Sequence, residues 1–273
     1  MNREMDDRRF VGSIPELYER YLVPQIFEPY AADVARRLAL RSPTRVLEVA
    51  AGTGVVTRAL ASVLGDHVWI VATDLNQTML DQAAARGTSR PVEWRQADAM
   101  QLPFEDAAFD VVVCQFGAMF FPDKAKAFAE TRRVLTPGGA FVFNVWDRID
   151  ENELADTVTT ALASVFPDDP PRFMARTPHG YSDCDVICRD LLAGGFVAPV
   201  QLDTVTMRSV APSARAAGIA FCQGTPLRAE IEARDPGGLE KATDAAAHAV
   251  AGRFGAGGVN AKMQAHVVTV TRD

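Results

Sequence analysis

The sequence lacks long apolar runs. It also lacks an N-terminal secretory signal, in which a charged segment is followed by an apolar one. No apolar run approaches the roughly 20 residues that a membrane-spanning helix needs. Residues 1–13 contain charges of both signs and no apolar stretch of the kind that a secretory signal carries. We therefore expect a cytoplasmic protein with no membrane span.

Positive charge is scarce as well. The chain has 28 Lys and Arg residues against 35 Asp and Glu, a formal net charge of -7, and no Lys/Arg-rich run. Such a surface does not attract the phosphate backbone of a nucleic acid. Nucleic acid is therefore not an expected partner, and a small molecule is the expected substrate.

Cysteine is too sparse for a disulfide framework. The four cysteines, Cys114, Cys184, Cys188 and Cys222, are scattered over 273 residues. Cys184 and Cys188 are one helical step apart, but only His179 lies near them in sequence as a further soft ligand. A metal site needs more ligands than this, so we expect no bound metal.

What the sequence does contain is the composition of a compact globular protein, with 48% hydrophobic and 23% charged residues. A chain of 273 residues is long enough for one large domain with insertions. We predict a single domain over residues 1–273. Its core is expected at about 31–150, 185–210 and 262–273, and a cap at 1–30, 151–184 and 211–261.

Strand and helix patterns alternate from about residue 44 to residue 145. Runs rich in β-branched residues predict strands, and the segments between them have helical periodicity. Alternation of this kind is typical of βαβ units in a parallel, doubly wound sheet. The predicted strands are 45–50, 67–74, 92–98, 110–116 and 140–146, and the predicted helices are 55–64, 76–86 and 126–135.

The alternation breaks after residue 146. A proline-rich loop at 167–183 is followed by a helix at 185–195, a strand at 200–210, a helical insert at about 213–254 and a last strand at 264–272. Two strands separated by an insert favour an antiparallel pair at the edge of the sheet. The predicted fold is thus α/β: a doubly wound, seven-stranded, mostly parallel, Rossmann-like sheet with an antiparallel edge strand and helical cap insertions.

A glycine loop follows the first predicted strand, in the stretch RVLEVAAGTGVVTRALA at 45–61. Ligands of open α/β sheets bind at the carboxyl ends of the strands, and Gly52 and Gly54 allow close backbone approach to the start of a helix. A nucleotide-like cofactor is implied. Glu48 would repel a pyrophosphate, however, and Thr57 stands where the dinucleotide fingerprint needs Gly or Ala, so a cofactor with a cation fits better.

LEVAAGTG at 47–54 resembles the first motif of the class I S-adenosylmethionine-dependent methyltransferases, and in particular their small-molecule, ubiquinone/menaquinone-type branch. The resemblance extends over about residues 44–147. It implies S-adenosylmethionine as the cofactor and S-adenosylhomocysteine as the product. Ala50 replaces the usual first glycine of the motif. By the same resemblance the loop residues that would contact the cofactor are Glu48, Ala50, Gly52, Thr53 and Gly54.

The second motif of the family resembles VATDLN at 71–76. Asp74 ends this predicted strand, and the resemblance makes it the acceptor for both ribose hydroxyls of the cofactor. One carboxylate has two oxygens, which suits a cis-diol. Leu75 and Met79 would line the adenine.

The third and fourth motifs follow in the same order. Asp98 and Ala99, in QADAMQLPF, resemble the motif that binds the adenine amine and ring. Gln115 and Phe116, at the end of the fourth predicted strand, would face the methyl group. RRVLTPGGAFVFNVW at 132–146 is similar to the turn of the family into its fifth strand and is the most specific single feature.

The sulfonium of such a cofactor is already a good leaving group, so the main task of the protein is in-line placement of a nucleophile. No catalytic triad is required. A hydroxyl or amine acceptor needs a base, and His179 and Asp147 are the candidates.

The acceptor is expected to be a small molecule. The fourth strand ends in CQFG rather than in a sequence of the D/N-P-P-Y type that grips a nucleobase or glutamine amide, and no Pro-Cys pair for cytosine methylation is present. Tyr18, Tyr21, Tyr181 and Arg228 are the candidate substrate contacts. The acceptor atom remains open, and so does the oligomeric state, with a homodimer compatible.

Two other functions remain open at this point. One is a noncatalytic S-adenosylmethionine-binding or regulatory protein, which would keep the pocket and show no turnover. The other is a nicotinamide-dependent oxidoreductase, which Glu48 and Thr57 disfavour. Comparing the thermal stabilisation given by the two cofactors would separate them.

Overall fold

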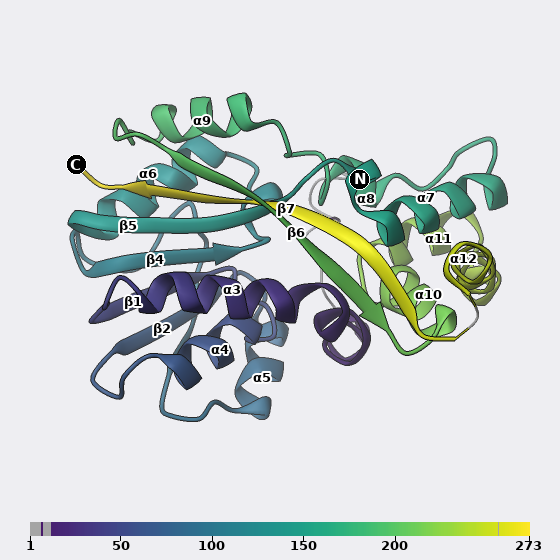
Figure 1. Ribbon diagram of the computed structural model, residues 1–273, viewed down its shortest axis with the longest axis horizontal. Coiled ribbons are helices and arrows are strands. Elements are labelled where there is room, and N and C mark those ends of the chain that lie inside the picture. Colours follow the sequence, from purple (N-terminus) through teal and green to yellow (C-terminus); the bar gives the residue numbers. More distant parts are fainter. Residues whose placement is uncertain (1–6, 8–11, 256) are drawn as a thin grey trace. The chain divides into compact units, whose positions relative to one another are not determined.

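The computed structural model describes residues 7, 12–255 and 257–273 (Figure 1). The chain divides into two compact units. The first, here called the sheet unit, consists of Tyr30–Val145, Tyr181–Val205 and Ala265–Asp273. The second, the helical unit, consists of Met1–Pro29, Trp146–Gly180 and Thr206–Gln264.

Seven strands form one sheet in the order β3-β2-β1-β4-β5-β7-β6. β1 to β5 are parallel, with β1 between β2 and β4. The strands are β1 (Arg45–Val49), β2 (Trp69–Asp74), β3 (Glu93–Gln96), β4 (Phe109–Gln115), β5 (Leu135–Trp146), β6 (Gln201–Ala211) and β7 (Val259–Thr271). The order confirms the predicted doubly wound sheet.

β7 runs antiparallel to its neighbours. Gly138 N donates to Arg272 O (2.7 Å) and Arg272 N donates to Gly139 O (2.8 Å), which joins the start of β5 to the end of β7. On the other side of β7, Thr204 Oγ1 lies 2.9 Å from His266 Nδ1. The predicted antiparallel edge is therefore confirmed.

Helices pack on both faces of the sheet because successive strand residues point to opposite sides. Val142 of β5 belongs to the cluster that contains Val34 of α3 (Glu28–Ala39) and Leu60 of α4 (Val55–Val63). Its neighbours Phe141 and Phe143 face the other way, and their rings pack against Phe128 of α6 (Lys124–Val134), with centroids 5.6 and 5.4 Å away. The helices of this unit are α3, α4, α5 (Gln77–Arg86), the short η2 (Ala118–Phe120), α6 (Lys124–Val134) and α9 (Cys184–Ala193) (Figure 1).

Local signals explain several helix ends. Asp123 caps α6 by accepting from Lys126 N (2.9 Å), and Asp183 caps α9 by accepting from the amides of the next turn. Asn76 has the residue type of a helix cap and precedes α5, but its side chain makes no capping bond.

The helical unit contains the N-terminal segment, the segment that follows β5, and the segment between β6 and β7 with the adjoining parts of these two strands. Arg176 ties three of its parts together by pairing with Asp7 (2.6 Å) and Glu230 (2.8 Å). Its elements are α2 (Ile14–Leu17), the π-helical η1 (Tyr18–Phe27), η3 (Ile149–Glu151), α7 (Glu153–Val165), α8 (Phe173–Arg176), α10 (Ala214–Gln223), α11 (Leu227–Arg234) and α12 (Leu239–Phe254). None of the helices described in the chain is both long enough and apolar enough to cross a bilayer.

Candidate functional site

The candidate cofactor site lies in the sheet unit, where the strand order reverses between β1 and β4. At such a reversal the connections leave the neighbouring strands in opposite directions, so a crevice opens at the carboxyl ends of the strands. The loop of residues 50–54 follows β1 at this point and leads directly into α4.

The backbone of this loop is left-handed at three positions. Ala50, Gly52 and Gly54 have φ angles of 56°, 57° and 80°. Gly54 is also crowded, since a Cβ there would lie 2.9 Å from Cη2 of Trp94. Ala50 adopts the conformation that glycine tolerates best, which explains why glycine is usual at the first position of the motif.

Asp74 at the end of β2 holds the loop. Its Oδ2 accepts from Gly52 N (2.8 Å) and its Oδ1 accepts from Asn76 N (2.8 Å). The side chain is buried, and burial raises the pKa of its carboxyl although these amides lower it. A carboxylate that the backbone fixes in this way is pre-oriented toward the edge of the sheet.

Glu48 of β1 is fully buried beside the same loop. Thr57 Oγ1 donates to Glu48 Oε2 over 2.5 Å. Burial raises the pKa of Glu48 to about 8, and the hydroxyl of Thr57 and the charge of Arg58 only partly oppose it. The sequence showed Thr57 only as a mismatch to the dinucleotide fingerprint, so its contact with Glu48 was missed.

Thr53 has a different environment from Thr57. Its Oγ1 is buried and has no hydrogen-bond partner among the residues that the structure describes. A buried hydroxyl without a partner is uncommon and costs free energy, so a missing ligand is one explanation for it. Its position within the glycine loop places this unused hydroxyl in the candidate cofactor site.

The predicted adenine contacts follow β2 and β3. Asp98 forms a tight turn, in which its Oδ1 accepts from Met100 N (2.9 Å), and Ala99 is buried within that turn. Met79 is buried on α5, whereas Leu75 is exposed. The amide of Ala97 donates to Asp74 O, so this turn is joined to the end of β2.

The end of β4 is held by Asn144 of β5. Phe116 has a φ angle of 50°, and its amide donates to the side-chain oxygen of Asn144 (2.9 Å). Gln115 contacts the side-chain amide of Asn144: Nδ2 of Asn144 lies 3.5 Å from Oε1 of Gln115. Asn144 could not be predicted from the sequence, because a single buried amide inside an apolar strand carries no motif.

Gly117 gives Ala50 the space for its methyl group. A Cβ at Gly117 would lie 2.5 Å from Cβ of Ala50 and 2.8 Å from Sγ of Cys114. The two loops after β1 and β4 are therefore in van der Waals contact through this pair. Burial raises the pKa of Cys114 to about 12, as expected for a core thiol.

Replacing Gly117 by Ala is expected to lower the free energy of unfolding by about 1–3 kcal/mol, because the added methyl group overpacks the contact. Gly252→Ala is the matched control: it lies in α12, where a Cβ meets nothing within 4 Å, and should stabilise the protein by up to about 1 kcal/mol. Urea unfolding of both variants measures the difference. Equal stability of Gly117→Ala and the parent protein would contradict the crowded contact.

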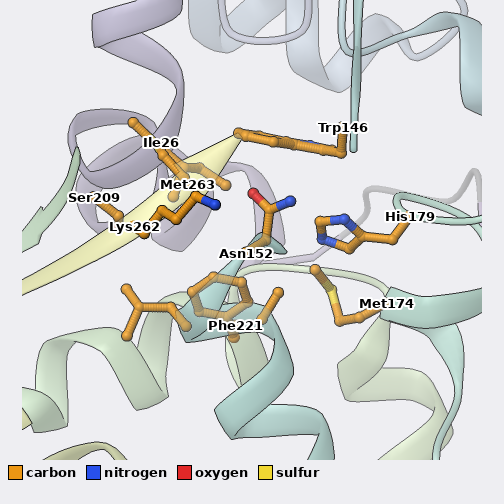
Figure 2. A pocket seen from close by; sticks show the side chains of 11 residues that line it. Ile26, Trp146, Asn152, Met174, His179, Ser209, Phe221, Lys262 and Met263 are labelled. Carbon is orange, nitrogen blue, oxygen red and sulfur yellow. The ribbon is translucent and has the colours of Figure 1, made fainter. Parts of the chain in front are cut away.

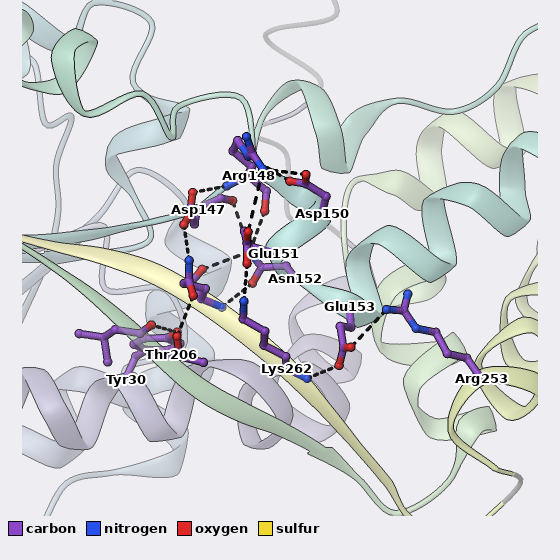
Figure 3. A network of polar contacts seen from close by, with 12 residues as sticks. Tyr30, Asp147, Arg148, Asp150, Glu151, Asn152, Glu153, Thr206, Arg253 and Lys262 are labelled. Atoms are coloured by element: carbon purple, nitrogen blue, oxygen red, sulfur yellow. Dashed lines mark hydrogen bonds and ion pairs between the residues drawn. The ribbon is translucent and has the colours of Figure 1, made fainter.

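The two candidate bases contact each other in the helical unit, and Figure 3 shows the polar contacts of one of them, Asp147. Nδ1 of His179 lies 2.8 Å from the main-chain oxygen of Asp147. The carboxylate of Asp147 accepts from Gln264 Nε2 and from Arg148 N, each at 2.7 Å. Burial lowers the pKa of His179 to about 4, so the imidazole is neutral at neutral pH.

The four candidate substrate residues have partners of their own. In the sheet unit, Tyr181 donates from its hydroxyl to Asp190 (2.8 Å), and burial raises the pKa of that hydroxyl. In the helical unit, Arg228 binds Glu232 and Ser13. Tyr18 and Tyr21 lie in η1, where Tyr18 packs on Phe27 and Arg20 lies over the Tyr21 ring.

Metal ligands do not gather anywhere in the described part of the chain: no group of three or more His, Cys, Asp or Glu side chains there could hold an ion. All four cysteines are unbridged.

Comparison with known proteins agrees with the motifs. Residues 47–143 match a family described as a methyltransferase domain. The ubiquinone/menaquinone biosynthesis C-methyltransferase of Ectopseudomonas mendocina is 32% identical over 170 residues, which cover 58% of this chain and 66% of that protein. The demethylmenaquinone methyltransferase of Deinococcus radiodurans is 36% identical over 129 residues, or 46% of this chain and 53% of that one. The chain thus spans less than two thirds of the length of these curated relatives.

Solved structures share the fold. An S-adenosylmethionine-dependent methyltransferase from Thermotoga maritima has a TM-score of 0.56 at 16% identity, with 98% of this chain and 99% of that chain covered. The cyclase SpnF also has a TM-score of 0.56, at 22% identity, with 90% and 80% covered. Residues 47–143 of this chain thus match a methyltransferase-domain family, and the order of the sheet and the glycine loop agree with that match.

Proposed function

We propose that the protein is an S-adenosylmethionine-dependent methyltransferase that moves a methyl group to a small organic acceptor by in-line displacement. The observation that carries the proposal is the pair of buried carboxylates, Glu48 and Asp74, around the glycine loop at the reversal of strand order. Carboxylates at this place suit a ligand with a cationic group and a ribose diol. They do not suit a bare pyrophosphate.

The residues of the sheet unit fit this cofactor. Asp74 would accept from the ribose hydroxyls, and the turn at Asp98 and Ala99 would hold the adenine. Oγ1 of Thr53, which has no partner among the described residues, would supply a hydroxyl to the part of the cofactor that lies against the glycine loop. When bound, the cofactor supplies an activated methyl group on a sulfonium, and the protein supplies the position and exclusion of water.

The remaining contacts belong to the same proposal. Glu48 would support the loop and the amino-acid end of the cofactor. Leu75 and Met79 would flank the adenine, while Gln115 and Phe116 would face the methyl group. Ala50, Gly52 and Gly54 allow the close approach of the backbone that such a ligand needs.

A small acceptor is supported from two sides. The curated relatives are named for the methylation of quinone precursors. The net charge of -7 disfavours a nucleic acid. We also propose that the protein acts in the cytoplasm and binds no nucleic acid. The two units would work as one domain, and the protein would form a homodimer.

The fold alone does not fix the reaction, since the similar chain SpnF is described as a cyclase. The deciding experiment is calorimetry of the whole chain with S-adenosylmethionine, S-adenosylhomocysteine and NADH. We expect micromolar binding of both sulfur ligands and none of NADH. Binding of NADH alone would overturn the cofactor assignment. Binding of the sulfur ligands without methyl transfer to any aromatic or quinone-like acceptor would favour the noncatalytic alternative.

A further inference from the structure

The helical unit contains a cavity of its own that is partly open to solvent, and its volume of about 300 Å³ includes that open space. Figure 2 shows the side chains around it, with Trp146 on one side and Phe221 and Met174 on the opposite side. Ile26 and Met263 complete an apolar lining. A cavity lined in this way favours a compact, flat and mostly apolar ligand.

Four polar side chains also line the cavity, and two of them are already engaged. Asn152 Nδ2 donates to main-chain oxygens that include Gln264 O (3.1 Å), and its Oδ1 accepts from Gln264 N (3.1 Å). Lys262 is paired with Glu151. Both groups contribute to the walls, and neither is a strong candidate for a ligand contact.

Ser209 of β6 is different. Its side chain is 1% exposed and lines the cavity, and its Oγ has no hydrogen-bond partner among the described residues. A buried hydroxyl that lacks a hydrogen bond costs free energy relative to a bonded one. A polar ligand group in the cavity would remove this cost.

His179 presents the second unused group. Its Nδ1 faces the main-chain oxygen of Asp147, which can only accept, so Nδ1 carries the proton. Nε2 then holds the lone pair, and no described residue bonds to it. In Figure 2 the imidazole reaches from its loop toward the other lining side chains. The low pKa of His179 keeps this acceptor uncharged at neutral pH.

We propose that the cavity of the helical unit binds a small aromatic compound with a hydroxyl or N–H group, which donates to Nε2 of His179 and contacts Oγ of Ser209. The identification of this compound as the methyl acceptor rests on the proposed function. The four substrate candidates of the sequence analysis, Tyr18, Tyr21, Tyr181 and Arg228, are not among the residues that line the cavity.

This assignment narrows the chemistry of the acceptor. The curated relative from Ectopseudomonas mendocina is named as a C-methyltransferase. A neutral imidazole acceptor that lines an apolar cavity selects a ligand by its donor group, because an analogue without the donor displaces water from Nε2 and gives no hydrogen bond in return. A phenol or an aromatic amine meets this requirement, and a ring without a donor does not.

Two probes test the site without any cofactor. Binding of 4-ethylphenol and ethylbenzene to the whole protein is measured by calorimetry, and the indole N–H signal of Trp146 reports the location by NMR, with Trp146→Phe for assignment. We expect 4-ethylphenol to bind at least about fivefold more tightly, and we expect the Trp146 signal to shift. Equal affinity of the two probes, or a shift confined to the other two tryptophans, would overturn the proposal.

A matched pair of variants tests the role of His179. In His179→Asn the side-chain amide can still donate to Asp147 O, but no atom remains at the position of Nε2. In His179→Gln a polar atom is kept near that position. We expect the preference for 4-ethylphenol to disappear in His179→Asn and to survive in part in His179→Gln. A preference that both folded variants retain would show that Nε2 makes no contact.

Failure of this site and failure of the proposed function give different results. Absence of the probe preference in the parent protein, with intact S-adenosylmethionine binding, would remove the cavity assignment alone. Normal probe binding without S-adenosylmethionine binding would remove the cofactor assignment alone. If His179→Asn does not fold, Ser209→Ala replaces it, and an unchanged affinity for 4-ethylphenol in that variant would contradict the contact with Oγ.

Discussion

Replacing Glu48 by Gln is expected to raise the free energy of unfolding above pH 8 by on the order of 4 kcal/mol, and to leave it nearly unchanged near pH 4.5. The Glu48 carboxyl has its pKa raised from 4.5 to about 8 by burial in the folded, ligand-free protein. Between these two values the unfolded chain is ionised at Glu48 and the folded chain keeps the proton. Stability from this group is therefore full below pH 4.5 and is lost as the pH rises through 8.

The Gln side chain keeps an oxygen that can accept from Thr57 Oγ1 and never ionises. Urea unfolding of both proteins near pH 4.5 and above pH 8 measures the difference. Other titrating groups are shared by the two proteins and cancel. If the two stabilities change in parallel over this range, the buried carboxyl does not titrate as described.

The same substitution is expected to weaken cofactor binding although it stabilises the folded protein. A cationic group of the cofactor favours the ionised form of Glu48, so binding near neutral pH should release a proton from the parent protein. Calorimetry in two buffers of different ionisation enthalpy detects that proton. We expect Glu48→Gln to bind more weakly and to lose the proton release, so greater stability would accompany poorer binding.

The second large effect is expected for Asp74→Ala, which should weaken S-adenosylmethionine binding by roughly 100-fold or more. Two hydrogen bonds from ribose hydroxyls to a carboxylate are each worth about 1.5–3 kcal/mol, and every 1.4 kcal/mol is about a tenfold change in affinity. The loop also loses an anchor, since Gly52 N and Asn76 N both donate to Asp74.

Asp81→Ala is the control for Asp74→Ala. Asp81 lies on the exposed side of α5, where Gln77 donates to it, and its removal should leave the affinity unchanged. Circular dichroism confirms that each variant is folded before the calorimetric titration. Unchanged affinity in folded Asp74→Ala would contradict the ribose assignment, whatever the behaviour of Asp81→Ala.

Much of the sheet could be predicted from the sequence because its strands are buried. β1, β2, β4 and β5 are near-continuous runs of β-branched and aromatic residues, which is typical of parallel strands covered on both faces. The separation of the last two strands by a helical insert also predicted the antiparallel edge. Only the lengths of the elements differed, as in β3, which begins and ends within the predicted 92–98.

The helical unit was less predictable. No helix was expected at α7, whose sequence ELADTVTTALASV is rich in Thr and Val, residues that lower intrinsic helix propensity. Its buried residues, among them Leu154, Val158 and Leu162, stabilise it through tertiary packing. The π-helical η1 contains Pro24, which local propensity places at a helix boundary and not within a helix.

The residues of the candidate sites also differ in how well the sequence predicts them. The cofactor residues lie on short motifs next to strand ends, where backbone geometry fixes their place, so the sequence indicated them. His179 was indicated only as a loop histidine, and Ser209 was not indicated at all. A cavity formed by segments as distant as Ile26, Ser209 and Met263 has no local sequence signal, because its lining depends on packing between them.

The contact between Ala50 and Gly117 restricts how these two positions can change over evolution. With alanine at 50, position 117 has no room for a side chain, because a Cβ built there would lie 2.5 Å from Cβ of Ala50. A relative with glycine at the first position, which also relieves the left-handed backbone, loses this clash but keeps a second one, since a Cβ at 117 would also lie 2.8 Å from Sγ of Cys114. The three positions should therefore covary across the family: a methyl group at 117 becomes permissible only after residue 50 has become glycine and the side chain at 114 has become smaller or moved.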